Sequence, residues 1–369
     1  MRKMLIAVIA ASALTSLGVS LTAQTRPAAK PAAAKPAAGR TADGHPDFTG
    51  MYDLATMTPV DRLPGVKDLV MTKEQADAAE KYEADRQVKN DAPLKGDREA
   101  PPVGGERLQG KSYQEVIENA AGGPVGGYNH FWLEEANKYA TVEGQKRSSI
   151  VIDPPDGHAP PMNEIGKKRN AAYLAGAVSP DAAESASSGP PGAFDGPELR
   201  PLAERCLMGF NSTAGPPALP NYFYNNLHQI VQTRDTVMIL TEMVHDARVV
   251  RMNQPHLPPQ IKKWMGDSVG KWEGDTLVID TTNFTGKTQF RGSSEKLHVV
   301  ERISRMADGN LLYRFTVEDP DTWDRAWTGE YPWVVTQEKL YEYACAEGNY
   351  TIANLLRGAR LAEAEKSKQ

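Results

Sequence analysis

Apolar and polar positions alternate with the two-residue period of β-strands over most of residues 225–345. The clearest example is 271–284, where the turn Glu273-Gly274-Asp275 precedes a run rich in β-branched residues, as in a β-hairpin. Short polar turns separate the predicted strands, which lie at 228–233, 236–252, 268–272, 276–284, 297–306, 311–317 and 339–344. A meander with short connections avoids exposed edges by closing into a barrel or curling over a helix. The pattern therefore predicts a mainly β fold, with an antiparallel β domain over 205–350 that forms a barrel or a curled sheet.

Residues 43–204 lack this alternation and predict an irregular, loop-rich region with short helices. Thr72-Lys73-Glu74-Gln75 and Ser112-Tyr113-Gln114-Glu115 both have the spacing of a capping box, so a helix is predicted after each, and a further helix is predicted over 163–176. Residues 179–220 are rich in Pro, Gly, Ala and Ser, which indicates a loop or a lid. At the other end, 351–369 is predicted to be a helix and tail that covers one end of the β domain.

The N-terminal residues have the pattern of a secretory signal peptide. The charged pair Arg2-Lys3 precedes an apolar run, and the small residue Ala23 fits a cleavage site. The apolar run is about 17 residues long and rich in small residues, so it is marginal for the alternative, a membrane-spanning anchor. Residues 24–42 are mostly Ala, Pro and Lys, which is typical of an extended linker. We therefore predict that 1–23 are removed, and that the mature chain is periplasmic or secreted with no stable membrane insertion.

Charge and cysteine content narrow the function classes. The formal net charge is −5 over 369 residues and no basic stripe occurs, which argues against nucleic-acid binding. Cys206 and Cys345 flank the predicted β domain, and an even pair in an exported protein predicts a disulfide, the alternative being two buried thiols. A bridge that closes a loop of about 140 residues would add roughly 4–5 kcal/mol in the chain-entropy model. No Cys-x-x-Cys pair, phosphate loop or dinucleotide fingerprint occurs, so no metal and no cofactor is predicted.

Glu301 is the first candidate for chemistry. In the predicted strand 297–306 it shares a face with Leu297, Val299 and Ile303, and this apolar face should point inward. Burial raises the pKa of a carboxyl group and suits it to general acid or base work. The alternative is a structural ion pair, and Arg248 is the predicted partner because it also falls among apolar neighbours.

Further candidates lie on the neighbouring predicted strands. Glu242, Asp246 and Arg248 share one face of 236–252, where they would line a pocket in which the arginine binds an anionic or carbonyl group. The alternative is an internal ion-pair network. His245, on the opposite face, is a candidate general base, and Asn283 is a candidate inward polar group for substrate binding.

Aromatic residues in Gly- and Pro-rich segments outside the β run are candidate pocket walls: Tyr128, Trp132 and Tyr222. The alternative is that they anchor long loops to the barrel.

Several strings over roughly 120–360 resemble a family of exported bacterial proteins that are usually described as hypothetical. The strings are 127–132, 149–157, Pro220-Asn221-Tyr222, Asn225-Asn226, 229–233, Glu242, His245-Asp246-Ala247-Arg248, 266–278, Thr282-Asn283-Phe284, Glu301-Arg302, Glu318-Asp319-Pro320 and Glu347-Gly348-Asn349-Tyr350. The resemblance implies export and does not imply a reaction. One position departs from the family pattern, since Ala346 stands where that pattern has His.

Two function classes follow. One is an exported lyase or hydrolase that uses carboxylate acid/base chemistry on a small polar or aromatic compound. The other is a non-catalytic ligand-binding protein of lipocalin-like shape. A cavity in which Glu301 meets Arg248 or a histidine favours the enzyme, and a purely apolar cavity favours the binding protein. In both classes the expected partner is a small molecule.

Overall fold

The computed structural model describes residues 39–90, 136–177, 194–200, 202–209, 215–221, 224–287 and 290–368. The chain separates into two units, Met1–Lys35 and Pro36–Gln369, and only the second contains described residues. The predicted signal peptide, most of the predicted linker and the predicted helix after Ser112 lie outside the described residues. No helix in the described ranges is long and apolar enough to cross a membrane.

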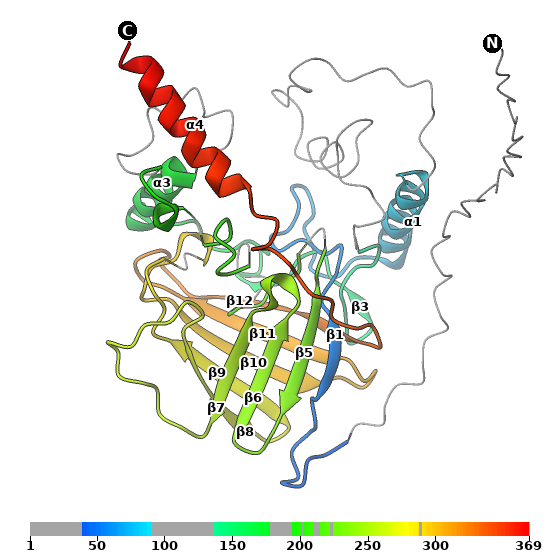
Figure 1. The fold of residues 1–369 in the computed structure, drawn as a ribbon. Helices are drawn as coiled ribbons and strands as arrows, with labels where there is room; N and C mark the ends of the chain where they lie inside the picture. Colours follow the sequence, from blue (N-terminus) through cyan, green and yellow to red (C-terminus); the bar gives the residue numbers. More distant parts are fainter. Residues whose placement is uncertain are drawn as a thin grey trace, which may run out of the picture. The chain divides into compact units, whose positions relative to one another are not determined.

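A nine-stranded barrel dominates the described part of the chain (Figure 1). Its strands, in spatial order, are β1 (Gly50–Asp53), β5 (Leu227–Gln232), β6 (Thr236–Thr241), β7 (Ala247–Met252), β8 (Asp267–Glu273), β9 (Thr276–Thr282), β10 (His298–Arg305), β11 (Leu311–Glu318) and β12 (Trp327–Thr336). The pairing of β1 with β12 closes the barrel. The predicted mainly β fold is confirmed, and its one parallel pair joins β7 to β8.

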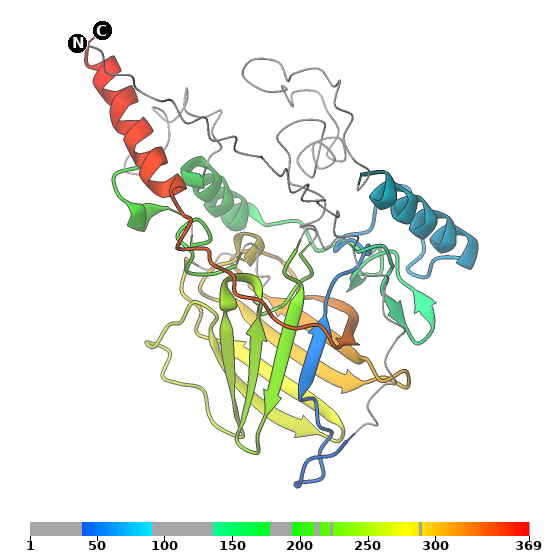
Figure 2. The same ribbon diagram turned by 45° about the vertical axis from the view of Figure 1, so that its right-hand side comes forward.

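The ninth strand comes from outside the predicted β domain. β1 pairs antiparallel with β5 on one side and β12 on the other, and Figure 2 shows it (blue) beside β5 (green). The short strand β4 (Val151–Asp153) pairs with the start of β12, and β1 pairs with the end of β12 along the same edge of that strand. Closure of the barrel therefore needs segments that are distant in sequence from the meander.

Inward and outward positions alternate along the strands as the sequence pattern requires. In β10 the side chains of Val299, Glu301 and Ile303 are fully buried, while His298, Val300 and Arg302 between them are partly exposed. Val237 and Ile239 of β6 and the inward residues of β9 complete the same core. Gly329 of β12 is required by this packing, because a Cβ there would lie 2.5 Å from the Phe315 ring.

The predicted strand 236–252 is wrong as a single element. It forms β6 and β7, separated by a short 3₁₀ turn, η5 (Met243–His245). Val244 in this turn has a φ of 59°, which is unusual for a β-branched residue. No Gly or Pro marks this turn in the sequence, and Met243 and Val244 are apolar enough to continue a strand.

The prediction for the end of the meander is also wrong. β12 was not predicted, because Gly329 and Pro332 interrupt the pattern. Pro332 is accommodated because the edge it faces is unpaired between the β4 contacts at Thr328 and the β1 contacts at Val334. The predicted strand at 339–344 forms no ladder and is extended chain.

Three helices in the described ranges flank the barrel's connections: α1 (Lys73–Asn90), α3 (Glu164–Ala177) and α4 (Thr351–Lys366). The capping box before α1 is present, since Gln75 N–H donates to Thr72 Oγ1 at 3.2 Å and Thr72 N–H donates to Gln75 Oε1 at 3.0 Å. The predicted helices at 163–176 and at the C-terminus are confirmed. A two-stranded hairpin, β2 (Thr141–Val142) with β3 (Gln145–Lys146), and two short 3₁₀ turns, η3 (Pro197–Leu199) and η6 (Phe290–Gly292), complete the elements.

The predicted disulfide between Cys206 and Cys345 is confirmed, with Cα atoms 5.7 Å apart. It joins the segment before the barrel strand β5 to the segment after β12. Asn349 reinforces the same junction by donating its side-chain amide to the Glu204 carbonyl at 2.6 Å.

Candidate functional site

Arg248 and Glu301 form an ion pair inside the barrel. Both side chains point inward from strands that are not neighbours, β7 and β10, so the pair crosses the interior. Arg248 Nη2 donates to Glu301 Oε1 at 2.7 Å, and Nη1 donates to Oε2. Their side chains are 3% and 0% exposed. The pairing predicted from the strand phases is therefore present.

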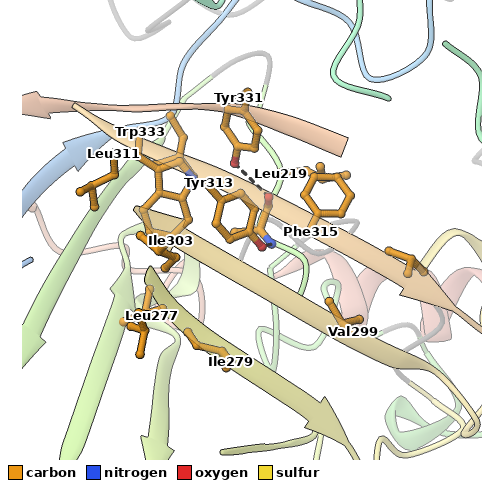
Figure 3. Close-up of a cluster of buried hydrophobic side chains, with 14 of the residues drawn as sticks. Leu219, Leu277, Ile279, Val299, Ile303, Leu311, Tyr313, Phe315, Tyr331 and Trp333 are labelled. Atoms are coloured by element: carbon orange, nitrogen blue, oxygen red, sulfur yellow. Dashed lines mark hydrogen bonds between the residues drawn. The ribbon is translucent and has the colours of Figure 1, made fainter. Parts of the chain in front are cut away.

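Two tyrosines connect this pair to a loop. Tyr313 of β11 donates to Glu301 Oε1 at 2.7 Å and accepts from the Ala218 N–H at 2.9 Å. Tyr331, directly opposite on β12, donates to the Ala218 carbonyl at 2.9 Å. Figure 3 shows Tyr313 and Tyr331 side by side at the centre of the cluster. A single residue, Ala218, is thus held at both its N–H and its C=O by side chains of the barrel.

Residues 215–220, with the sequence Gly-Pro-Pro-Ala-Leu-Pro, are buried along their whole length. The sequence placed them in a loop or lid, and the structure places this end of that region in the core with Ala218 and Leu219. Because the segment has three prolines, it has few N–H groups to satisfy on burial.

Aromatic rings surround the buried pair. Tyr313 stacks on Trp333 with ring centroids 4.7 Å apart and meets Tyr331 edge-on at 5.6 Å. Phe315 packs edge-on against Trp327 at 5.7 Å. Such rings offer flat apolar walls beside a small number of polar atoms, which is the usual composition of a small-molecule site.

Burial sets the protonation of the cluster. Desolvation raises the pKa of Tyr313 well above its ordinary value, and the nearby Glu301 charge adds to this effect. Desolvation also raises the pKa of Tyr331. For Arg248 burial acts to lower the pKa, but the charge and hydrogen bonds of Glu301 outweigh it and the pKa is raised. The tyrosines therefore stay neutral and the arginine stays charged at ordinary pH.

Several polar atoms in this interior have no hydrogen-bond partner among the described residues, including Arg248 Nε, Thr241 Oγ1 and the indole Nε1 of Trp327 and of Trp333. The side chains of Arg248 and Thr241 are 3% and 0% exposed. Thr241 is the last residue of β6, and its side chain faces the interior of the barrel. Arg248 is the second residue of β7, and its side chain faces the same interior. Buried polar groups are nearly always paired in native proteins, so these atoms are exceptions to the usual pairing.

Glu242, Asp246 and His245 are not brought to this pair. The turn η5 lies between Glu242 and Arg248 and breaks the strand phase, so the face predicted to carry both is not formed. Glu242 Oε1 accepts from the Tyr341 N–H at 2.9 Å, and Asp246 Oδ2 accepts from the Gly209 N–H at 3.0 Å.

These three residues instead lie at the β6–β7 turn, beside the chain that carries the disulfide. Burial raises the pKa of Asp246 to about 6, against the opposing effect of the Gly209 N–H. His245 is exposed.

Asn283 is also placed differently from the prediction. Its φ of 59° turns the chain at the end of β9, and its side-chain amide donates to the Leu257 carbonyl at 3.0 Å. It therefore ties down the connection 253–266 and does not join Arg248 and Glu301. Tyr128, Trp132 and Tyr222 lie outside the described residues.

A second group of ionisable side chains, missed by the sequence reasoning, lies on the outer face of β8–β11. Its members alternate between carboxylates and imidazoles in the order Asp267, His256, Asp280, His298 and Glu318, and we call this group the outer chain. The connection 253–266 contributes only the second member, and the four strands β8 to β11 contribute the others. Among the described residues, no set of three or more His, Cys, Asp or Glu side chains has the arrangement of a metal site.

Comparison with known proteins adds no relative: no protein-family model matches the chain, and no curated protein is significantly similar to it. The resemblance to a family of exported bacterial proteins stays a prediction.

Proposed function

We propose that this protein is an exported β-barrel that binds a small polar or aromatic molecule in its interior. The observation that carries the proposal is the buried Arg248, whose Nε lacks a partner among the described residues while its Nη atoms hold Glu301. An inward arginine surrounded by aromatic rings is a ready hydrogen-bond donor for a ligand. The disulfide supports export, because such bridges persist in oxidising compartments.

The charge balance of the interior indicates the kind of ligand group. Glu301 neutralises Arg248, so a further full charge beside them would be buried without a counter-ion at high cost. A neutral acceptor, such as a carbonyl or hydroxyl oxygen, can accept from Arg248 Nε without that cost. Thr241 Oγ1 supplies a second polar contact on the same interior. We therefore propose a ligand with a neutral oxygen on a flat or aromatic frame.

Entry of such a ligand would involve residues 215–220. The Ala218 peptide already uses the hydroxyls of Tyr313 and Tyr331, so a ligand near these rings would replace or extend this contact. The segment is held by these two side-chain hydrogen bonds and by the packing of Ala218 and Leu219 in the core, so its displacement by a ligand would break both kinds of contact.

Catalysis is the second candidate, and the meeting of Glu301 with Arg248 favours it. A general base, however, needs a lone pair directed at the proton that it removes. Glu301 already accepts from three donors, two on Arg248 and one on Tyr313. A carboxylate has about four acceptor sites, so these three donors leave only one for the proton of a lyase or hydrolase substrate, and we therefore rank binding first.

The test is a ligand screen on the purified full chain by thermal shift, with sugars, phenolic compounds and fatty acids. Hits are then repeated on the double variant Arg248→Met/Glu301→Leu, which keeps the interior neutral. The matched control is Arg302→Met/Glu273→Leu, which removes an ion pair between β10 and β8 on the outer face of the barrel. We expect binding in the wild type and the control and its loss in the interior variant. A folded interior variant that binds as well as the wild type would refute the site, and a hit that is consumed would favour the enzyme.

A further inference from the structure

We infer that the outer face of β1, β5, β6 and β7 is an interface at which two copies of this chain form a two-fold symmetric dimer. The inference is independent of ligand binding in the interior. It rests on a group of six apolar side chains on this face, which we call the outer apolar patch: Met51, Val231, Met238, Leu240, Ala247 and Val249.

The two-residue period of the strands directs the patch away from the core. On β5 to β7 its members alternate with four core residues that are at most 1% exposed: Ile230, Val237, Ile239 and Val250. By contrast, Val249 is 53% exposed, Ala247 is also exposed, and the other members of the patch are partly exposed. These apolar side chains therefore face solvent.

The strand register gathers the patch into two adjacent rows. The first row crosses from β1 to β7 through Met51, Gln229, Leu240 and Ala247. The second row crosses from β5 to β7 through Val231, Met238 and Val249. Side chains that face each other across neighbouring strands are about 4.5–5.5 Å apart, so each row is continuous. Gln229 is the single polar side chain within the two rows.

The outer face of β8 to β11 differs from the patch. It carries the outer chain of carboxylates and imidazoles, together with the ion pair between Arg302 and Glu273. Polar side chains are usual on the solvated face of an antiparallel sheet, whereas a contiguous exposed apolar patch marks an interaction site. In Figure 1, β5, β6 and β7 face the viewer, and the chain between β12 and α4 crosses near their upper ends. The asymmetry indicates that one side of the barrel is a contact surface.

The chemistry of the patch favours a second copy over a membrane surface. Segments that bind at a membrane surface combine Trp or Phe with Lys or Arg, and the patch contains none of these. Oligomers of one chain are mostly two-fold symmetric, so that the same patch of each copy meets in the contact. Like charges would repel across such a contact, but the patch is uncharged. Two sheet faces of this kind can pack about 10 Å apart, as in a β-sandwich.

The area of the patch indicates a reversible dimer. Four strands spaced about 4.8 Å apart and two rows about 7 Å apart cover roughly 250–300 Å² of the sheet. A standard interface buries about 800 Å² on each partner, with an apolar core and a polar rim. The patch therefore provides the core, and the surrounding side chains must provide the rest. One of them is Tyr341, which is 76% exposed and whose N–H is held by Glu242 just beyond the end of β6.

The test is sedimentation of the purified full chain over a wide range of protein concentration, by analytical ultracentrifugation. We expect a concentration-dependent equilibrium between monomer and dimer. Val249→Lys places a charge in the second row, where it would be buried against the partner copy, and should raise the dissociation constant at least about a hundredfold. The matched control is Val300→Lys, which changes an outward valine of β10 beside Asp280 and should leave the equilibrium unchanged.

A second variant keeps the inference testable if Val249→Lys does not fold. Ala247→Lys changes an exposed residue in the first row and should weaken the dimer in the same way. The inference is overturned by a wild-type chain that stays monomeric at every concentration, by a dimer that the lysine variants in the patch leave intact, or by equal weakening in Val300→Lys. A monomer that binds vesicles of phosphatidylcholine and phosphatidylglycerol would assign the patch to a membrane and would also overturn it.

Discussion

Tyr313 donates its hydroxyl hydrogen to Glu301 at 2.7 Å, from the strand next to the one that carries the carboxylate. The same hydroxyl accepts from Ala218, so this one contact links the buried ion pair to residues 215–220. The interior of the barrel is thus a continuous polar path from Arg248 to the loop, enclosed by aromatic rings.

Glu301→Gln should lower the free energy of unfolding by about 3–5 kcal/mol, because it leaves Arg248 charged and unpaired in the interior. Arg248→Met/Glu301→Leu should cost less than the single change, since it removes both charges together. Urea unfolding followed by tryptophan fluorescence measures both variants. Glu347→Gln, at an exposed carboxylate, is the control. A single variant as stable as the wild type would show that the pair contributes little.

Tyr313→Phe should lower stability by about 1–3 kcal/mol, because the Ala218 N–H then has no acceptor and Glu301 loses a donor. The matched change Tyr350→Phe removes a hydroxyl from a side chain that is 74% exposed and should have no measurable effect. Thermal unfolding with calorimetry compares the two. Similar small effects at both positions would contradict the role given to the Tyr313 hydroxyl.

The double change Cys206→Ser/Cys345→Ser should lower stability by about 4–5 kcal/mol in the chain-entropy model, because the bridge spans 139 positions of sequence. The wild-type protein treated with a reductant should lose a similar amount. Chemical denaturation under oxidising and reducing conditions gives both values. If reduction leaves the midpoint unchanged, the junction between 202–209 and the C-terminal segment is held by other contacts.

The pKa of Asp246 is about 6 in the folded protein, above the ordinary value of 3.8, because burial disfavours its charged form. The folded state therefore binds more protons than the unfolded state between these values, and stability should fall as the pH rises from about 4 to 6. A shift of this size corresponds to about 1–3 kcal/mol. Asp246→Asn should flatten this part of the pH–stability profile, because it removes the titration while keeping an acceptor for Gly209.

The profile is measured by denaturation at closely spaced pH values. Asp43→Asn, at an exposed carboxylate, serves as the control and should leave the slope unchanged. Parallel profiles for the wild type and Asp246→Asn would refute the shift.

The alternation of inward and outward side chains was readable from sequence because it follows from the geometry of a single strand. It placed Glu301 on an apolar face and gave the fold class correctly. A closed barrel has one interior, so two charged residues that both point inward must meet or be separately satisfied. For this reason the pairing of Arg248 with Glu301 could be predicted without knowing the strand order.

The β6–β7 turn, the closure of the barrel and the outer chain depend on features that no local sequence pattern shows. The turn at Val244 separates Glu242 from Arg248, although no Gly or Pro marks this turn in the sequence. The barrel is closed by Gly50–Asp53, a four-residue strand too short to show a period. The outer chain depends on the cross-strand register and on a connection that folds back over β8 and β9.

By itself, the sequence determined which side chains face inward, because the two-residue period and the burial of apolar surface act strand by strand. It also determined that two cysteines at the borders of the meander could be bridged. The tertiary structure alone decided that the Ala218 peptide enters the core and that the imidazoles of His256 and His298 share one oxygen of Asp280. These contacts join residues far apart in the chain, and their formation depends on barrel closure and strand register, which are properties of the whole sheet.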